Sequence, residues 1–284
     1  MKSFLEIELE RQVYYPGEKI TGKVNLQTES PIKVRKLILT FHAEEVLGAD
    51  AASTSLNPYL VKTSLITPLI KDEKILKEPK PPESQIEISA EEFPFEFIIP
   101  ENSPASFSSG YSSCLYFLTA RAEIPMGVDI ISKSHITIFP RYEEKKPMPI
   151  DFGTEEENLK IRISVEKDIF YIADSVEGII DIEYPSAEQP SKIIMALKAL
   201  EESLEEKIIH KRELWNTRQM VELDVKSAAE AAYGKFSFPI PRQAPFSYQW
   251  NTFKVSWYLE LRVEFPSHKF KTVSSKIEVR RKGF

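Results

Sequence analysis

Cysteine is almost absent from this sequence, because Cys114 is the only one in 284 residues. A single thiol excludes an internal disulfide and a cysteine-rich metal cage, which fits a reducing compartment. The N-terminus has no apolar signal-like region, and no run of about 18 uncharged apolar residues occurs anywhere. We therefore expect a cytoplasmic protein without a membrane span, and a peripheral role at membranes stays open.

Glycine and histidine are also scarce, and basic residues do not outnumber acidic ones. Nine glycines leave little for phosphate-cradling loops, and neither a G-x-G-x-x-G nor a Walker A motif occurs. The four histidines, at positions 42, 135, 210 and 268, are spread singly, without the short ligand spacing of a zinc site. The net charge of −6 lacks the basic excess that phosphate contacts to nucleic acid need. The sequence thus predicts no cofactor, no metal site and no nucleic acid partner.

Catalytic motifs are weak. Gly110-Tyr111-Ser112-Ser113-Cys114 resembles a nucleophile elbow, but cysteine replaces the second glycine, and the motif lies between predicted strands rather than before a helix. Neighbouring carboxylates such as Glu44 and Glu45 would point to opposite faces of a strand, which is wrong for a shared acid–base site. We predict a protein that is not an enzyme, with a hydrolase using Ser112 or Ser113 as the alternative to eliminate.

Alternation of apolar and polar residues is the dominant pattern that is present. Leu5, Ile7 and Leu9 alternate with glutamates, as expected for a strand with one buried face. Twenty prolines punctuate such runs, often at their ends, where a missing N–H harms a sheet least. Many short strands with proline-rich turns predict an all-β fold, a sandwich or barrel. Similar strands are predicted at residues 22–26, 37–41, 93–99, 134–139, 159–165, 253–265 and 276–279.

The sequence contains an internal duplication. Val13–Gly22 aligns with Ile169–Gly178 at an offset of 156, and Phe95–Pro125 aligns with Phe236–Pro266 at an offset of 141. The second alignment has ten identities in 31 ungapped positions. Since both blocks occur in the same order in each half, we predict two copies of one domain, residues 1–146 and 147–284. The linker is predicted at Arg141–Glu157.

Two regions depart from the simple repeat. The first copy has 15 more residues between its blocks, within Leu47–Glu91, where residues 48–55 and 77–84 are predicted to be loops. Lys192–Met220 has leucines at helical spacing among good helix formers. The duplication nevertheless aligns Ile193–Leu200 with an alternating strand, so we favour a hairpin of long strands over a helix for Glu201–Met220.

The duplicated blocks carry a family signature. Tyr15-Pro16-Gly17-Glu18, followed by Gly22-Lys23-Val24 and Pro31–Arg35, resembles the opening of an arrestin N-domain. Phe93–Phe107 with Leu115–Leu118 resembles the later signature of that domain. Phe236–Pro241, Pro245–Ser247 and Val255–Leu259 are similar to its C-domain counterpart. The resemblance spans Phe4–Val279 and identifies the chain as a member of the arrestin-like superfamily, which includes arrestins, α-arrestins and the arrestin-like subunit of retromer.

The resemblance implies two tandem immunoglobulin-type β-sandwich domains and a non-enzymatic adaptor that binds receptor tails or trafficking and signalling components. The chain looks like an α-arrestin-type core without a tail, since it stops at Phe284 with no clathrin-type or PPxY motif. Glu6, Glu8 and Glu10 stand where a phosphate sensor would carry paired lysines. A constitutive structural subunit of a retromer-like trafficking coat is the alternative function.

Two kinds of partner site are candidates. Basic clusters would hold a phosphorylated tail or anionic lipid headgroups, because several cations act together and Arg forks match phosphate. The alternative interpretation is that these clusters form the ordinary solvated surface of a Lys/Glu-rich protein. An exposed sheet edge that captures an extended peptide is the second kind, but the sequence does not say which edge. The candidate basic residues are Lys33, Arg35, Lys36, Lys207, Lys211 and Arg212.

Overall fold

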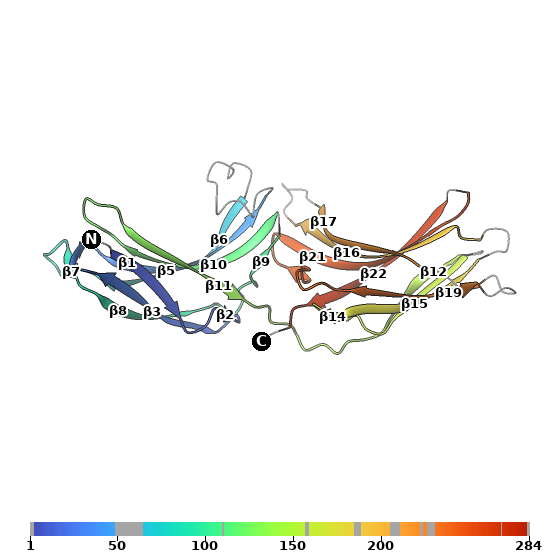
Figure 1. Ribbon diagram of the computed structural model, residues 1–284, viewed down its shortest axis with the longest axis horizontal. Helices are drawn as coiled ribbons and strands as arrows, with labels where there is room; N and C mark the ends of the chain where they lie inside the picture. The colour runs from blue at the N-terminus through green and yellow to red at the C-terminus, as the bar shows by residue number, and fades with distance from the viewer. Residues whose placement is uncertain are drawn as a thin grey trace. The chain divides into compact units, whose positions relative to one another are not determined.

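The computed structural model divides the chain into two compact units, Met1–Glu143 and Glu144–Phe284. It describes residues 3–48, 65–109, 111–156, 159–184, 189–204, 211–221, 224–225, 231–267 and 269–282. These residues form strands and turns without a helix (Figure 1), and so the described part of the chain has no helix fit to cross a membrane. The sequence-based boundary after residue 146 remains a prediction of where the domains separate.

The first unit, blue to green in Figure 1, packs two sheets against each other. One sheet has the order β1-β3-β8 and the other β2-β11-β10-β5-β6, with β9 beside β10, and β4 pairs with β7 in a separate two-stranded sheet. Phe41 of β5 and Phe97 of β8 meet between the sheets with ring centroids 5.7 Å apart. The strands are β1 (Ser3–Leu9), β2 (Val13–Tyr14), β3 (Lys19–Thr28), β4 (Ile32–Val34), β5 (Leu37–Leu47), β6 (Leu65–Lys77), β7 (Ile86–Ile88), β8 (Glu91–Ile98), β9 (Phe107–Ser108), β10 (Ser112–Ala122) and β11 (Ile130–Ile138).

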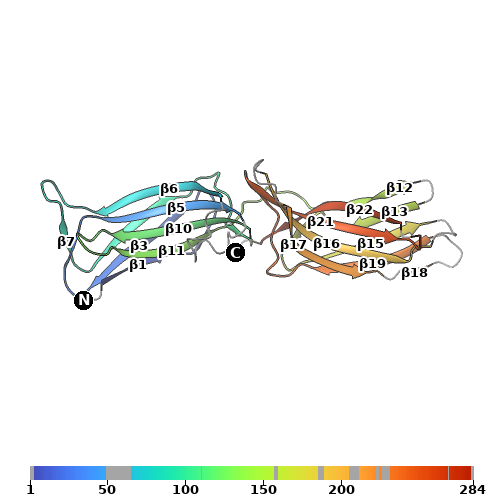
Figure 2. The same cartoon turned by 90° about the horizontal axis from the view of Figure 1, so that it is seen from above.

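The second unit, yellow to red, repeats this plan (Figure 2). Its sheets have the orders β12-β13-β15-β19-β18 and β14-β22-β21-β16-β17, with β20 beside β21. The predicted fold class, two tandem β-sandwiches, is confirmed. The strands are β12 (Ile150–Glu156), β13 (Leu159–Val165), β14 (Ile169–Tyr171), β15 (Ser175–Glu183), β16 (Lys192–Ser203), β17 (Lys211–Met220), β18 (Asp224–Val225), β19 (Ala231–Pro239), β20 (Tyr248–Gln249), β21 (Phe253–Glu264) and β22 (Phe270–Arg280).

In both copies, two backbone segments approach each other closely at an aligned glycine. A Cβ atom added at Gly22 would lie 2.2 Å from the carbonyl oxygen of Glu8 and 2.9 Å from Cζ of Phe95. At Gly178 it would lie 2.6 Å from the carbonyl oxygen of Ser164 and 2.5 Å from Cζ of Phe236. Only glycine leaves room for these contacts. Gly22 and Gly178 therefore mark the same close approach of backbone segments in the two copies.

A hydrogen bond from a core aromatic ring to a proline carbonyl is also duplicated. The Tyr116 hydroxyl donates to the carbonyl oxygen of Pro104 at 2.6 Å. In the second unit, Trp257 Nε1 donates to the carbonyl oxygen of Pro245 at 3.0 Å. Tyr116 is 1% exposed and Trp257 is fully buried, so each ring fills a core while its polar atom finds a partner. In each copy, therefore, an aligned core ring is anchored by a hydrogen bond to an aligned proline carbonyl.

Two predictions from the irregular regions have different outcomes. Residues 201–203 end β16 and residues 211–220 form β17, and the two strands pair antiparallel, so the hairpin is correct and the helical spacing misleading. Leu197 and Leu259 lie opposite each other on paired strands, which shows that the leucines serve a sheet. Part of the predicted linker is wrong, because residues 150–156 form β12. Residues 78–84 are a loop as predicted, whereas residues 49–55 of the other predicted loop lie outside the described residues.

Candidate functional site

The open side of β1 is a candidate binding edge, because β1 is the terminal strand of its sheet. The Glu10 amide donates to the carbonyl oxygen of Thr21, and the Glu8 carbonyl oxygen lies against Gly22. Even-numbered residues therefore direct their peptide groups towards β3, and alternation turns the odd-numbered ones outward. The outward peptide groups are those of Leu5, Ile7 and Leu9.

The side chains of β1 divide between two faces. Leu5 is buried and faces the core, whereas Glu6 and Glu8 are exposed on the outer face. Glu8 accepts a hydrogen bond from the Asn25 side-chain amide at 2.6 Å and lies 3.3 Å from Lys23 Nζ. A strand added beside β1 would meet the peptide groups that point away from β3, an apolar inner side and an acidic outer side, with β11 of the other sheet lying close by.

In the second unit, the edge equivalent to β1 is already occupied. β13 aligns with β1 at the offset of 156, and β12 pairs antiparallel along its whole length, from Ile150 opposite Val165 to Glu156 opposite Leu159. β12 has no counterpart before β1 among the described residues. In the second unit, the edge equivalent to β1 therefore accepts an extended segment of the same chain.

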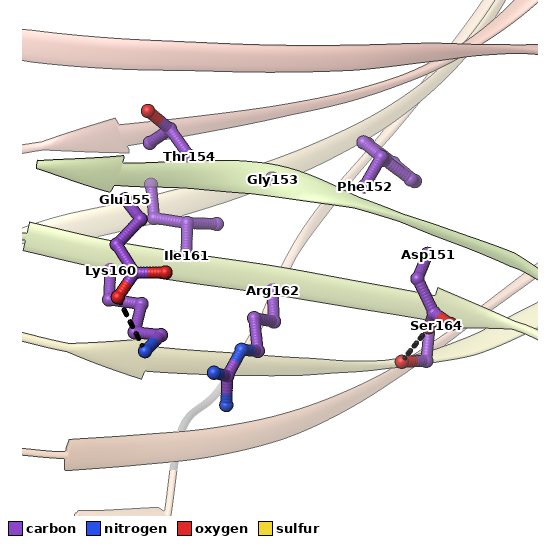
Figure 3. Close-up of a pocket in the computed structure, with 9 residues that line it drawn as sticks. All are labelled: Asp151, Phe152, Gly153, Thr154, Glu155, Lys160, Ile161, Arg162 and Ser164. Atoms are coloured by element: carbon purple, nitrogen blue, oxygen red, sulfur yellow. Dashed lines mark hydrogen bonds and ion pairs between the residues drawn. The ribbon is translucent and has the colours of Figure 1, made fainter.

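The β12–β13 pair matches charges across its outer face (Figure 3). Lys160 Nζ lies 2.8 Å from Glu155 Oε1, and Ser164 Oγ lies 2.6 Å from Asp151 Oδ1. The hydrogen bond from Lys160 lowers the pKa of Glu155. An acidic strand thus lies against the basic face of β13, so charge complementarity accompanies strand addition here.

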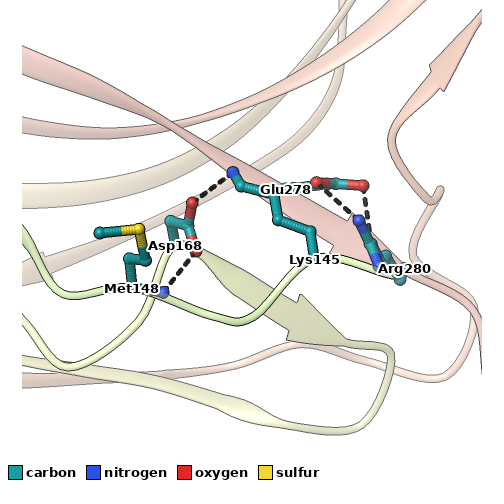
Figure 4. A network of polar contacts seen from close by, with 5 residues as sticks. All are labelled: Lys145, Met148, Asp168, Glu278 and Arg280. Atoms are coloured by element: carbon teal, nitrogen blue, oxygen red, sulfur yellow. Dashed lines mark hydrogen bonds and ion pairs between the residues drawn. The ribbon is translucent and has the colours of Figure 1, made fainter. Parts of the chain in front are cut away.

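The segment that enters β12 is fastened by Asp168 (Figure 4). Its carboxylate accepts hydrogen bonds from Lys145 Nζ at 2.6 Å and from the Met148 amide at 2.9 Å. The Asp168 carbonyl oxygen also accepts a hydrogen bond from the Glu278 amide at 2.8 Å. Burial raises the pKa of Asp168, but the bonds from Lys145 and Met148 outweigh it and leave the pKa below its ordinary value. Residues 145–148 are therefore held to the second unit.

Asp168→Asn should weaken this attachment in a pH-dependent way. With its pKa lowered by folding, ionised Asp168 stabilises the fold above the unfolded-state pKa of about 3.9, and this contribution is lost as pH falls through the folded-state pKa. We expect the variant to unfold at lower denaturant than the wild type at pH 7, with the gap closing towards pH 2. Equilibrium unfolding at both pH values measures this, and Asp181→Asn, an exposed position on β15, is the control. A gap independent of pH would contradict the assignment.

The structure places the basic candidates at separate sites. Lys33 lies in β4, 4.0 Å from Glu87, and Lys36 lies 3.7 Å from Glu123. Arg35 is exposed between them, so these three basic residues share one end of the first unit. Their role as a binding site stays a prediction.

The second basic group is partly neutralised. Glu202 lies 2.8 Å from Lys211 and 3.0 Å from Lys254, and the bond from Lys211 lowers the pKa of Glu202. Arg212 is exposed beside Lys211 on β17. Lys207 lies outside the described residues. This group has the acidic neighbours expected of an ordinary charged surface.

The catalytic alternative has no accessible nucleophile in the described residues. Ser112 and Ser113 are fully buried at the start of β10, and Cys114 is fully buried beside them. The segment is a strand rather than the strand-to-helix turn of a nucleophile elbow. His42 packs on Phe117 at 5.1 Å between ring centroids, and burial lowers its pKa. These side chains belong to packing.

Sequence reasoning missed two features of these sites. The strand β12 carries a short alternation, Ile150 and Phe152, which the neighbouring prolines and Gly153 obscured. The duplication also aligns Glu45 with Glu201, and both side chains are almost fully buried, at 2% and 0% exposure. Their alignment at the offset of 156 was the signal that could have found this pair.

Comparison with known proteins gives two similarities. Residues 5–144 match the family described as arrestin (or S-antigen), N-terminal domain. "Arrestin domain-containing protein 17" of Caenorhabditis elegans is 24% identical over 140 residues, which cover 45% of this chain and 31% of that protein. The match thus spans less than a third of that relative's length.

Proposed function

Because the chain belongs to the arrestin-like family, we propose that it is a non-enzymatic adaptor that binds extended segments of protein partners at the β1 edge. The partners proposed are receptor tails or trafficking and signalling components. The choice of the β1 edge as the binding site rests on the pairing of β12, which occupies the equivalent edge of the second copy. A bound segment would hydrogen-bond to the outward peptide groups of β1, as in other cases of strand addition.

The charge of the edge selects a basic segment. In the second unit, the outer face of β13 carries Lys160 and Arg162, and it pairs with an acidic strand. The aligned positions in β1 are Phe4 and Glu6, followed by Glu8, so the sign is reversed. A segment with apolar residues facing the core and lysine or arginine between them fits this edge. A phosphorylated segment would meet like charge there.

The direct test uses two peptides derived from the sequence of β12. One has the seven-residue sequence of β12, and the other has lysine in place of its glycine and acidic residues. We expect the lysine peptide to bind roughly tenfold more tightly, since two cross-strand charge pairs each contribute up to about 1 kcal/mol. Fluorescence polarisation of labelled peptides against the full chain measures the difference.

Reversing the edge charge is the matched variant. Glu6→Lys with Glu8→Lys should invert the peptide preference. Glu92→Lys with Glu96→Lys makes the same charge change on the outer face of β8 and should leave the preference unchanged. If the lysine peptide fails to bind, or both double variants behave alike, the β1 edge is not the binding site.

The adaptor role itself is tested separately with native lysate. A regulated adaptor should recover partners whose amount changes with conditions such as phosphatase treatment. Partners that co-purify at fixed stoichiometry and resist phosphatase would instead support a constitutive coat subunit.

A further inference from the structure

The turn between β10 and β11 presents apolar side chains directly to solvent. Met126 is 100% exposed and Val128 is 91% exposed, and Ile131 on the following strand is 60% exposed. The turn joins two strands at the end of the first unit that also carries β7 (Figure 1). Because the Met126 and Val128 side chains are exposed, they bury no apolar surface and do not stabilise either sheet of the sandwich.

The turn is held in shape by polar contacts below its tip. The Asp129 carboxylate accepts hydrogen bonds from the Ile124 amide at 3.0 Å and from Arg121 Nε at 2.7 Å. Met126 has a φ of 53°, in the left-handed region that favours glycine or asparagine. The fold therefore carries both an exposed apolar side chain and an unfavourable backbone conformation at Met126.

The second copy shows that the apolar tip is not required by the fold. The offset of 141 aligns Met126 with Ser267 and Val128 with Lys269. The flanking strands β21 and β22 pair as β10 and β11 do. A hairpin of the same register thus forms with Ser267 and Lys269 at the aligned positions, so the fold does not require Met126 and Val128 to be apolar.

Basic side chains surround the base of this turn. The Arg35 amide donates to the carbonyl oxygen of Glu123 at 2.8 Å, which places Arg35 next to the turn. Lys33, Lys36 and Arg121 lie near it, each with a carboxylate partner: Glu87, Glu123 and Asp129 respectively. Arg35 is exposed, and its charge adds to the effects of the Ile124 amide and Arg121 that lower the pKa of Asp129. The four named cations exceed these three carboxylates by one.

We propose that this turn is a membrane contact, in which Met126 and Val128 insert into a lipid bilayer and Arg35 binds anionic headgroups. A protein partner is the less fitting occupant, because a stable interface needs roughly 800 Å² on each side and two projecting side chains do not supply it. A bilayer accepts a narrow convex tip, and basic side chains beside it bind the anionic surface. This contact is separate from strand addition at β1, and either can fail without the other.

Vesicle sedimentation tests the contact with the full chain. We expect binding to phosphatidylcholine vesicles that contain phosphatidylserine, and weaker binding to phosphatidylcholine alone. Met126→Asn with Val128→Ser should reduce binding roughly a hundredfold, since burial of each side chain contributes about a tenfold factor. Asparagine suits the positive φ, so the turn is retained. Arg35→Gln should reduce binding to the anionic vesicles roughly fivefold and leave binding to neutral vesicles unchanged.

Met148→Asn is the matched control, because Met148 is an exposed methionine of the second unit. It should bind vesicles like the wild type. A wild-type chain that does not sediment with anionic vesicles overturns the proposal, as does a Met126/Val128 variant that binds unchanged.

Insertion depth gives a second readout. Cys114 is fully buried, so Met126→Cys adds a single accessible thiol for an environment-sensitive dye. Dye fluorescence should rise on addition of anionic vesicles if the tip enters the apolar layer. Vesicle binding without this rise would show that another surface makes the contact and would overturn the proposal.

Discussion

Replacing Trp257 with alanine should lower the unfolding free energy of the second unit by about 3–5 kcal/mol. The indole is fully buried in β21, so alanine leaves a cavity where the two sheets pack. The change also removes the indole donor from the partly buried Pro245 carbonyl oxygen, which adds the loss of one hydrogen bond. Both effects act on the same core, so this should be among the most destabilising single substitutions in the unit.

Tryptophan fluorescence is suited to this measurement. The three tryptophans, Trp215, Trp250 and Trp257, all lie in the second unit, so the signal reports on that unit even after one is removed. Trp257→Phe retains a buried ring and should cost only roughly 1–2 kcal/mol, mainly from the lost hydrogen bond. A loss below about 1 kcal/mol for Trp257→Ala would mean that the core closes around the missing ring.

Gly153→Val should detach β12 from β13. A Cβ atom at Gly153 would lie 1.8 Å from the carbonyl oxygen of Ile161 and 2.7 Å from its carbonyl carbon, both rigid backbone atoms. The valine side chain has no space there, so the strand must move away. The edge of β13 would then be open, as the edge of β1 is in the first unit.

Hydrogen exchange distinguishes this result from general destabilisation. The amides of β13 that face β12, those of Ile161, Ile163 and Val165, should exchange roughly a hundredfold faster. The amides of Arg162 and Ser164 face β15 and should keep their protection. Asp151→Asn, on the same strand, removes an outer-face contact without a clash and should leave all five protected. Equal loss at all five amides in Gly153→Val would show that the sheet itself unfolds.

The detached variant also bears on the proposed function. Gly153→Val should bind a peptide with the native β12 sequence, because the edge of β13 and its basic outer face become available for pairing once β12 has left. The wild-type second unit should not bind it, since β12 already occupies that edge. This comparison tests strand addition without knowledge of the natural partner.

Much of the fold was predictable because its signals are local or repeated. Alternation of Leu5, Ile7 and Leu9 places one face of a strand inside, and this needs only neighbouring residues. The helical spacing at Leu197 and Leu200 gave a competing local signal, and the duplication resolved it in favour of a strand. The candidate basic residues were found as sequence clusters, but their surroundings were not predictable, because Glu202 reaches Lys254 across a strand pairing.

The sequence by itself determined the all-β class, the duplicated blocks and many of the strands, since periodicity and duplication are properties of the chain alone. Only the tertiary structure decided that residues 150–156 leave the linker to cover β13, and that β1 is the terminal strand of its sheet within the described part of the chain. It also decided that Arg35 lies beside the Met126 turn, through a backbone bond to Glu123 far along the sequence. Such pairings depend on which distant segments the folded sheets bring together, and local patterns do not encode this choice.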